Sequence, residues 1–127
     1  MICGDMPVIA LRPEGAIVVY PSPWNGKEGL YGDVSAPLGG TIVLEQGECN
    51  TIERISPRDA FSAAFSQFAC IPDTVQEINV FSSLVDRTLS QYPVWKLRNR
   101  GDAAAAAMTR DALASYLSER RQSNDPI

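Results

Sequence analysis

The amino-acid sequence predicts a mixed α/β (α+β) protein in which a β-hairpin and a mixed sheet precede a helical C-terminal half. Short apolar runs bounded by glycine and proline occupy residues 6–55, as is typical of strands. Two longer segments, 57–92 and 102–121, repeat apolar residues at helical spacing instead. The expected order is roughly β-β-loop-β-β-α-α-β-α. Because 127 residues is the length of one ordinary domain, we expect residues 1–127 to form a single domain.

The first two predicted strands form a β-hairpin. Residues Met6–Leu11 are mostly apolar and are followed by Arg12-Pro13-Glu14-Gly15, which has the composition of a tight turn. The next run, Ala16–Tyr20, is apolar without polar alternation, as expected for a strand covered on both faces. The chain therefore reverses at the turn and leaves the hairpin at Tyr20.

A long irregular connection, Tyr20–Gly40, follows the hairpin. It holds five of the nine glycines, three of the nine prolines and one of the two tryptophans. Long connections inside compact domains are usually functional or disordered, and solvated linkers seldom carry large aromatic side chains. We therefore predict that this loop is the working surface of the protein.

Two further strands follow the loop. Thr41–Leu44 is a second continuous apolar run, and Thr51–Ile55 reads as a half-exposed strand. Between them Gln46–Asn50 turns the chain.

The next residues predict two helices. Ser56-Pro57-Arg58-Asp59 has the serine, proline and acid of a helix start, and Pro72-Asp73 separates the two helices. The apolar stripe of each helix is expected to face the core. The stripe of the first helix is Phe61, Phe65 and Phe68, and that of the second is Val75, Ile78, Phe81, Val85 and Leu89.

A strand and a third helix complete the predicted order. Pro93 favours an extended conformation at the residue before it, and Val94–Leu97 reads as a strand. Residues 99–102 (NRGD) cap a last helix, in which Met108, Ala112 and Tyr116 share one face. Arg120 and Arg121 suit the negative C-terminal end of that helix.

Composition argues against several classes of function. The net charge of −4 and the pI near 4.7 argue against a nucleic-acid partner, and no apolar run approaches the ~20 residues that span a membrane. Residues 1–11 lack the basic start of a signal peptide. Since the chain has no histidine, Ser–His and Cys–His nucleophile pairs and His-ligated metals are excluded. The acids Asp5, Asp33, Glu45 and Glu48 could hold a divalent cation, but no spacing matches a calcium loop, and we assign no metal site. Three widely spaced cysteines, Cys3, Cys49 and Cys70, favour free thiols in the cytoplasm.

The Gly26-Lys27 pair in the loop suggests a phosphate site. It is not a Walker A loop, because Pro21 stands five residues before Gly26 and Glu28 follows the lysine where serine or threonine is required. A weaker interpretation has Trp24 stack on a ligand while Lys27 and the neighbouring glycine amides hold an anion. The alternative is that Trp24 anchors the loop on the core and that Lys27 points to solvent.

Three cations alternate along the late strand and should leave one face of the sheet. They are Lys96, Arg98 and Arg100, whereas Trp95 and Leu97 should point into the core. Such a row could receive a phosphate or a carboxylate. It is more often the solvated face of an edge strand, where positive charge deters edge-to-edge pairing, and we favour that interpretation.

Several segments, read in order, resemble one protein family. Residues 2–9 (ICGDMPVI) resemble a strand that ends in two aspartates, and residues 21–27 (PSPWNGK) resemble a proline-tryptophan-x-glycine-lysine loop. Residues 36–47 and 50–57 are similar to the strand–turn–strand and helix start that come next, and residues 92–97 to a late strand. Together they resemble the C-terminal half of the HPr kinase/phosphoenolpyruvate carboxykinase-like P-loop kinases, in particular the small HPr-kinase-related bacterial proteins.

The resemblance implies roles for particular residues. Asp5 matches the second aspartate position and would be the residual catalytic residue, as a metal or base position, whereas Gly4 occupies the first. The remaining implied positions are ligand-binding residues. The loop residues Trp24, Asn25, Gly26 and Lys27 would contact a ligand or phosphoacceptor, and Arg98 and Arg100 would contact an anion.

The glycine-rich P-loop of the family lies upstream of the paired aspartates and has no counterpart in this chain. Without it, a P-loop kinase lacks the amide cradle and the lysine that position the transferred phosphate. The resemblance therefore implies a partial or degenerate kinase-like domain, one half of a split kinase, that transfers no phosphate on its own. ATP and Mg²⁺ would bind only if a separate P-loop-bearing half completed the site.

A second hypothesis is a non-catalytic binding or regulatory module that recognises a peptide or protein partner through residues 20–40. The split-kinase hypothesis implies a P-loop-bearing partner or a homodimer, because an unpartnered half should leave an apolar sheet edge exposed. Neither hypothesis involves nucleic acid or a membrane.

Overall fold

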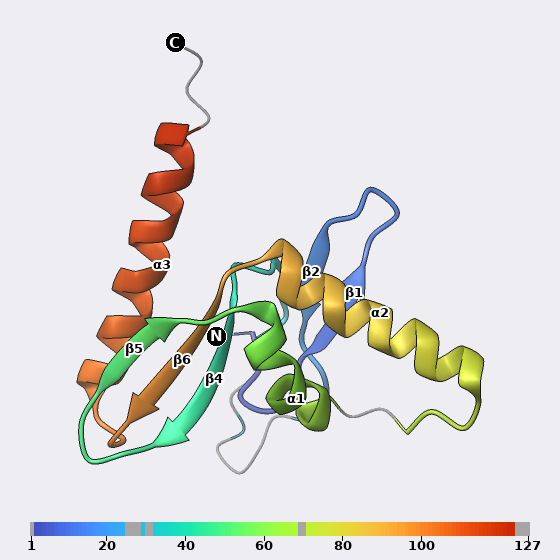
Figure 1. Cartoon of the computed structure of the whole chain (residues 1–127), viewed down its shortest axis with the longest axis horizontal. Helices are drawn as coiled ribbons and strands as arrows, with labels where there is room; N and C mark the ends of the chain where they lie inside the picture. The colour runs from blue at the N-terminus through green and yellow to red at the C-terminus, as the bar shows by residue number, and fades with distance from the viewer. Residues whose placement is uncertain (1, 25–28, 30–31, 69–70, 124–127) are drawn as a thin grey trace. The chain divides into compact units, whose positions relative to one another are not determined.

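The computed structural model describes residues 2–24, 29, 32–68 and 71–123 of the chain. The chain forms two compact units, an N-terminal unit of residues 1–38 and a C-terminal unit of residues 39–127. The predicted mixed α/β class and the approximate element order are confirmed, with one additional short strand inside the predicted loop (Figure 1). The elements are β1 (Val8–Leu11), β2 (Ile17–Tyr20), β3 (Ala36–Pro37), β4 (Thr41–Gln46), β5 (Thr51–Arg54), α1 (Pro57–Gln67), α2 (Val75–Gln91), β6 (Val94–Asn99) and α3 (Ala103–Ser123).

The N-terminal unit is an antiparallel three-stranded sheet in the order β1-β2-β3. The hairpin pairs Val8 with Tyr20 at one end and Leu11 with Ile17 at the other. The turn closes through a hydrogen bond from the Gly15 amide to the Arg12 carbonyl at 2.8 Å, and Gly15 adopts φ +89°, a conformation that costs a glycine little. The hairpin predicted from the turn sequence is therefore confirmed.

The third strand lies near the end of the predicted loop. It is only two residues long, and it pairs antiparallel with β2 through Val18↔Pro37 and Val19↔Ala36. The Leu38 amide extends the pairing with a 2.9 Å hydrogen bond to the Ile17 carbonyl. Both ends of the long connection are therefore tied to β2.

The C-terminal unit contains a mixed sheet in the order β4-β6-β5. β6 runs parallel to β4, from Thr41↔Val94 to Gln46↔Asn99, and antiparallel to β5. β6 is therefore the central strand, and the interpretation of its cations as guards of an edge strand was wrong. Because β4 and β5 are consecutive in sequence and flank β6, the turn that joins them crosses the end of β6 (Figure 1).

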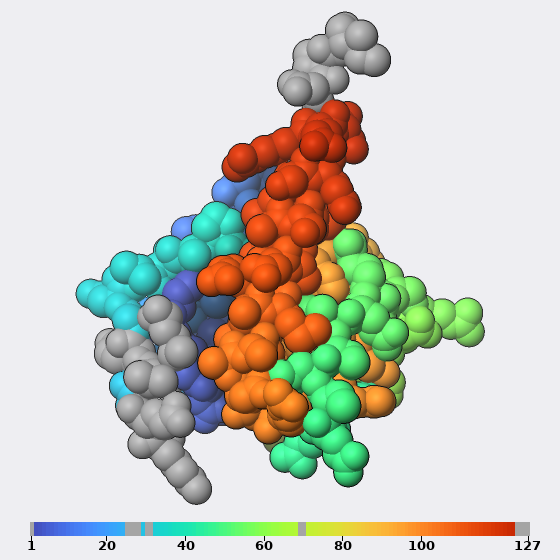
Figure 2. All heavy atoms as spheres, turned by 90° about the vertical axis from the view of Figure 1, so that its left-hand side faces the viewer, coloured from blue at the N-terminus to red at the C-terminus, as the bar shows by residue number. Residues whose placement is uncertain are grey.

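Helices cover both faces of this sheet. Side chains alternate between the faces of a strand, so the neighbours Val94 and Trp95 lie on opposite faces of β6. Val94 belongs to the core cluster formed with α1 and α2. Trp95 instead packs edge-on against Tyr116 of α3, with ring centroids 6.1 Å apart. Figure 2 shows α3 as a continuous column across its face of the unit, beside the residues of β5.

The first two helices begin at side-chain caps. The Ser56 hydroxyl accepts the Asp59 amide at 3.1 Å, and Pro57 is the first residue of α1, as the sequence predicts. α2 begins with a capping box that sequence analysis missed: Thr74 accepts the Glu77 amide at 3.1 Å, and the Glu77 carboxylate accepts the Thr74 amide at 3.3 Å. Among the described residues, no helix combines the length and apolar character that a bilayer span requires.

The core contains more alanine and aliphatic side chains than the predicted apolar stripes of α1 and α2 suggest. In α1 the fully buried residues are Ala60 and Ala64. The three phenylalanines predicted as core are only half-buried and pack against it. In α2 the stripe is buried at Phe81, Val85 and Leu89, but its first two members, Val75 and Ile78, are exposed.

A truncation series in α2 tests this distribution. Leu89 is 1% exposed and Val80, on the same helix, is 65% exposed. Leu89→Ala should lower the free energy of unfolding by ~2–5 kcal/mol, because it removes buried methyl groups and leaves a cavity. Val80→Ala should leave stability unchanged or slightly raised, since alanine is the better helix former. Urea unfolding followed by circular dichroism measures both variants, and an equal loss in the two would contradict the described core.

Candidate functional site

The best-defined polar arrangement of the N-terminal unit lies where the chain leaves β2. Ser22 is only 3% exposed, and its hydroxyl donates to the Met6 carbonyl at 2.5 Å and accepts the Trp24 amide at 3.2 Å. The Met6 amide donates in turn to the Trp24 carbonyl at 3.2 Å. These bonds fix the backbone of Trp24 against the segment that precedes β1.

The side chain of Trp24 does not follow its backbone into the core. It is 61% exposed, which excludes the interpretation of Trp24 as a core anchor. Because tryptophan is highly buried on average, an exposed tryptophan on a backbone held by several hydrogen bonds is unusual. This residue is therefore the most prominent feature of the candidate site.

Cys3 lies beside the same residues. Its thiol donates to the Trp24 carbonyl at 3.3 Å and lies 3.8 Å from the Ser22 hydroxyl oxygen. Hydrogen bonds from the backbone, first at Asp5 and then at Ser22, lower the pKa of the Cys3 thiol from its ordinary value. Sequence analysis assigned Cys3 no role, because only the fold brings residues 3–6 against residues 22–24.

Of the other predicted site residues of this unit, the structure describes Asp5 but not the three that follow Trp24. Asp5 is exposed and lies next to Met6, so it adjoins the Trp24 segment through the backbone bonds described above. Asn25, Gly26 and Lys27 lie outside the described residues. The site of the N-terminal unit therefore consists of Cys3, Asp5, Ser22 and Trp24.

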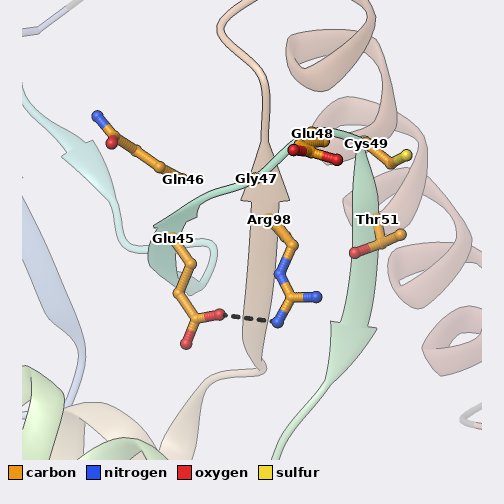
Figure 3. Close-up of a pocket in the computed structure, with 7 residues that line it drawn as sticks. All are labelled: Glu45, Gln46, Gly47, Glu48, Cys49, Thr51 and Arg98. Carbon is orange, nitrogen blue, oxygen red and sulfur yellow. Dashed lines mark hydrogen bonds and ion pairs between the residues drawn. The ribbon is translucent and has the colours of Figure 1, made fainter.

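In the C-terminal unit, two of the three predicted cations share one carboxylate. Lys96 Nζ lies 3.3 Å from Glu45 Oε1, and Arg98 Nη2 lies 3.4 Å from Glu45 Oε2. Figure 3 shows Glu45 and Arg98 pointing toward each other from the neighbouring strands β4 and β6. The hydrogen bond from Lys96 is the largest cause that lowers the pKa of Glu45, followed by the charge of Lys96 and by Arg98.

Gly47 lets the β4–β5 turn cross close to Arg98. Its amide donates to the Asn99 carbonyl at 2.9 Å, and a Cβ added at Gly47 would collide with Arg98 Cγ and Cδ, so any side chain there would displace the arginine. An open depression lies at this crossing. It is lined by Glu45, Gln46, Gly47, Glu48, Cys49, Thr51 and Arg98 (Figure 3). With two carboxylates and one guanidinium, this lining does not favour an anion.

Arg100 belongs to a separate group. It lies beyond the end of β6, and its Nε donates to Asp102 Oδ2 at 2.6 Å. Asn50 joins the two turns, because its amide group donates to Asp102 Oδ1 at 2.6 Å and accepts the Arg100 amide at 3.0 Å. The hydrogen bonds from Arg100 and then Asn50 lower the pKa of Asp102. The predicted row of three cations is thus a pair on Glu45 plus a turn residue on Asp102.

Among the residues that the structure describes, no group of three or more cysteine, aspartate or glutamate side chains is placed to bind one metal ion. No protein-family model matches the sequence, and comparisons with curated proteins and with solved structures found no match.

The shared carboxylate gives a test by titration. Because the pKa of Glu45 is lowered in the folded protein, its contribution to stability is present above the ordinary glutamate pKa and is lost as the pH falls through the lowered value. Lys96→Met should raise the pKa of Glu45 more than Arg98→Met does, since the Lys96 hydrogen bond is the largest cause. NMR titration of the Glu45 carboxyl group measures both shifts. A larger shift in Arg98→Met, or no shift in either variant, would contradict the described geometry.

Proposed function

We propose that this chain is a non-catalytic binding module that recognises a peptide or protein partner through residues 20–40. The observation that carries the proposal is the exposed Trp24 side chain on a backbone held by Ser22 and Met6. Tryptophan is enriched among the residues that dominate binding energy at protein interfaces. A backbone ordered before binding lowers the conformational entropy lost on association, so this arrangement favours recognition.

Further exposed apolar side chains of the N-terminal unit support a protein partner. Met6, which is hydrogen-bonded to Trp24 through the backbone, is 41% exposed, and Val34 in the same long connection is 60% exposed. Exposed apolar side chains mark interaction sites where they form a patch, and Met6 adjoins Trp24 through their backbone bond. The acidic composition argues against nucleic acid, so the proposed ligand is an extended or folded protein segment with apolar side chains. The free thiols of Cys3 and Cys49 are consistent with the proposed cytoplasmic location.

The second proposal is the split-kinase hypothesis, in which a separate P-loop-bearing half supplies the nucleotide site. The observation that favours it is the adjacency of two family-like motifs, since the backbone bond between Met6 and Trp24 brings the Asp5 segment beside the proline-tryptophan segment. ATP and Mg²⁺ would enter only with the other half. For Arg98 and Arg100 to contact an anion, each would have to leave the carboxylate that it now meets.

Truncation of the tryptophan tests the first proposal. Peptides selected for binding to the wild-type chain should bind Trp24→Ala roughly 30-fold more weakly or worse, as expected for loss of a dominant interface residue. Stability should change by less than about 1 kcal/mol, because the side chain is exposed. Leu117→Ala, which truncates an exposed leucine of α3, is the matched control and should bind like wild type. A loss of ~3–5 kcal/mol in stability, or unchanged binding by Trp24→Ala, would contradict the proposal.

Nucleotide binding tests an expectation that both proposals share, namely that this chain alone has no nucleotide site. A binding module should show no thermal shift with ATP and Mg²⁺, and the chain alone should not turn over ATP, because it contains no P-loop sequence. A shift with the chain alone, removed by Asp5→Asn but kept in Glu14→Gln, would contradict both proposals, because each leaves the chain alone without a nucleotide site. Turnover by the purified chain would overturn the claim that it transfers no phosphate alone.

A further inference from the structure

The two edges of the sheet in the C-terminal unit differ sharply. β5 is a short edge strand with two charged residues, Glu53 and Arg54, and α3 packs against it. The Arg54 guanidinium lies over the rings of Trp95 and Tyr116, at 5.3 and 4.8 Å from their centroids. Short length, charge and helical cover are the usual protections of a sheet edge. β5 has all three.

The opposite edge is less protected, since α1 packs against β4 but the strand is neither short nor marked by a free charge. β4 is six residues long, TIVLEQ, and contains no proline or lysine. In the described part of the chain its only strand partner is β6. Leu44, in the middle of the strand, is 67% exposed. The single charge of β4, Glu45, is held by Lys96 and Arg98 and so does not guard the edge as a free charge.

The direction of the backbone groups identifies which ones are open. The amides of Thr41 and Gly47 both donate to the β6 side, at Pro93 and Asn99. Since backbone groups alternate in direction along a strand, the odd-numbered residues of β4 face β6. The N–H and C=O groups of Ile42, Leu44 and Gln46 therefore point away from the sheet, ready to pair with another strand.

We propose that β4 pairs antiparallel with β4 of a second copy of this chain, which joins the two sheets across a two-fold axis. An axis at Val43 places each Val43 opposite the other, and places Ile42 opposite Leu44 of the second copy. In this register the outward-facing residues Ile42 and Leu44 exchange both backbone hydrogen bonds, as an antiparallel pair requires. The exposed Leu44 then meets an apolar partner on the same face of the joined sheet.

Two features favour a closed dimer of two copies over continued addition of further copies. In the proposed register Glu45 lies opposite Thr41 of the second copy, so the two glutamates do not face each other. A two-fold pairing uses the same edge of both copies and closes on itself, whereas the protected β5 edge offers no second contact. The dimer therefore stops at two copies. The residues that it pairs all belong to β4, so Trp24 is not among them.

Sedimentation velocity on the full chain over a wide concentration range tests the proposal. Wild type should form a dimer, and Leu44→Lys should weaken dimerisation by roughly tenfold or more, because it places a charge on the paired edge. Leu117→Lys, the same change at another exposed leucine, should dimerise like wild type. Leu44→Pro gives a second disruption, since it removes an outward N–H while it leaves the odd-numbered amides that face β6 intact.

Hydrogen exchange in the wild-type chain supplies a readout that needs no variant. The Ile42 amide should become protected as the concentration rises, whereas the Val43 amide, which faces β6, should be protected throughout. A monomer at every concentration overturns the proposal. So do dimers that persist in both Leu44→Lys and Leu44→Pro, assemblies larger than two copies, and Ile42 exchange that does not depend on concentration.

Discussion

The C-terminal unit depends on the placement of β6 between β4 and β5. The strand supplies Val94 to the core beneath α1 and α2, and Trp95 to the opposite face beneath α3, so both helical layers take their positions from it. Its central place also puts Lys96 and Arg98, which stay partly exposed, beside β4. Glu45 of β4 meets both cations, so the charged pattern on this central strand is partly solvated and partly paired. Loss of the β4–β6 register would remove the sheet, the helical layers and the charge balance together.

Much of this architecture was readable in the sequence because local signals decided it. The turn ending in Gly15 and the cap at Ser56 fix boundaries through contacts a few residues apart. The place of β6 was not readable, since its alternating cations also suit an edge strand, and only the long-range pairing with Glu45 distinguishes the two. The start of α2 at Thr74 was predictable from the spacing of Thr74 and Glu77, which is that of a capping box, whereas Pro72 alone gives only an approximate boundary.

The candidate sites were predicted less completely than the elements that carry them. Composition pointed to Trp24, but whether a loop tryptophan is buried depends on what the rest of the fold offers it, and here the fold holds its backbone while it leaves the ring exposed. Cys3 and Ser22 became part of the site only through bonds between segments about twenty residues apart. Arg100 does not share a strand face with Lys96 and Arg98, because β6 ends at Asn99 and the Arg100 side chain bonds Asp102 instead.

The turn through Gly47, which crosses the end of β6, has a consequence for the order of folding during synthesis. β4 and β5 are made early, but they do not pair with each other, and their shared neighbour is completed only after α1 and α2 have been translated. Until then both strands lack a hydrogen-bonded partner, and the apolar run of β4 is open on two sides. Sheets whose strands pair over a long sequence separation form slowly, and their unpaired edges are prone to aggregation until pairing is complete. The capped helices α1 and α2 depend on local contacts, so they are suited to form first, before β6 completes the sheet.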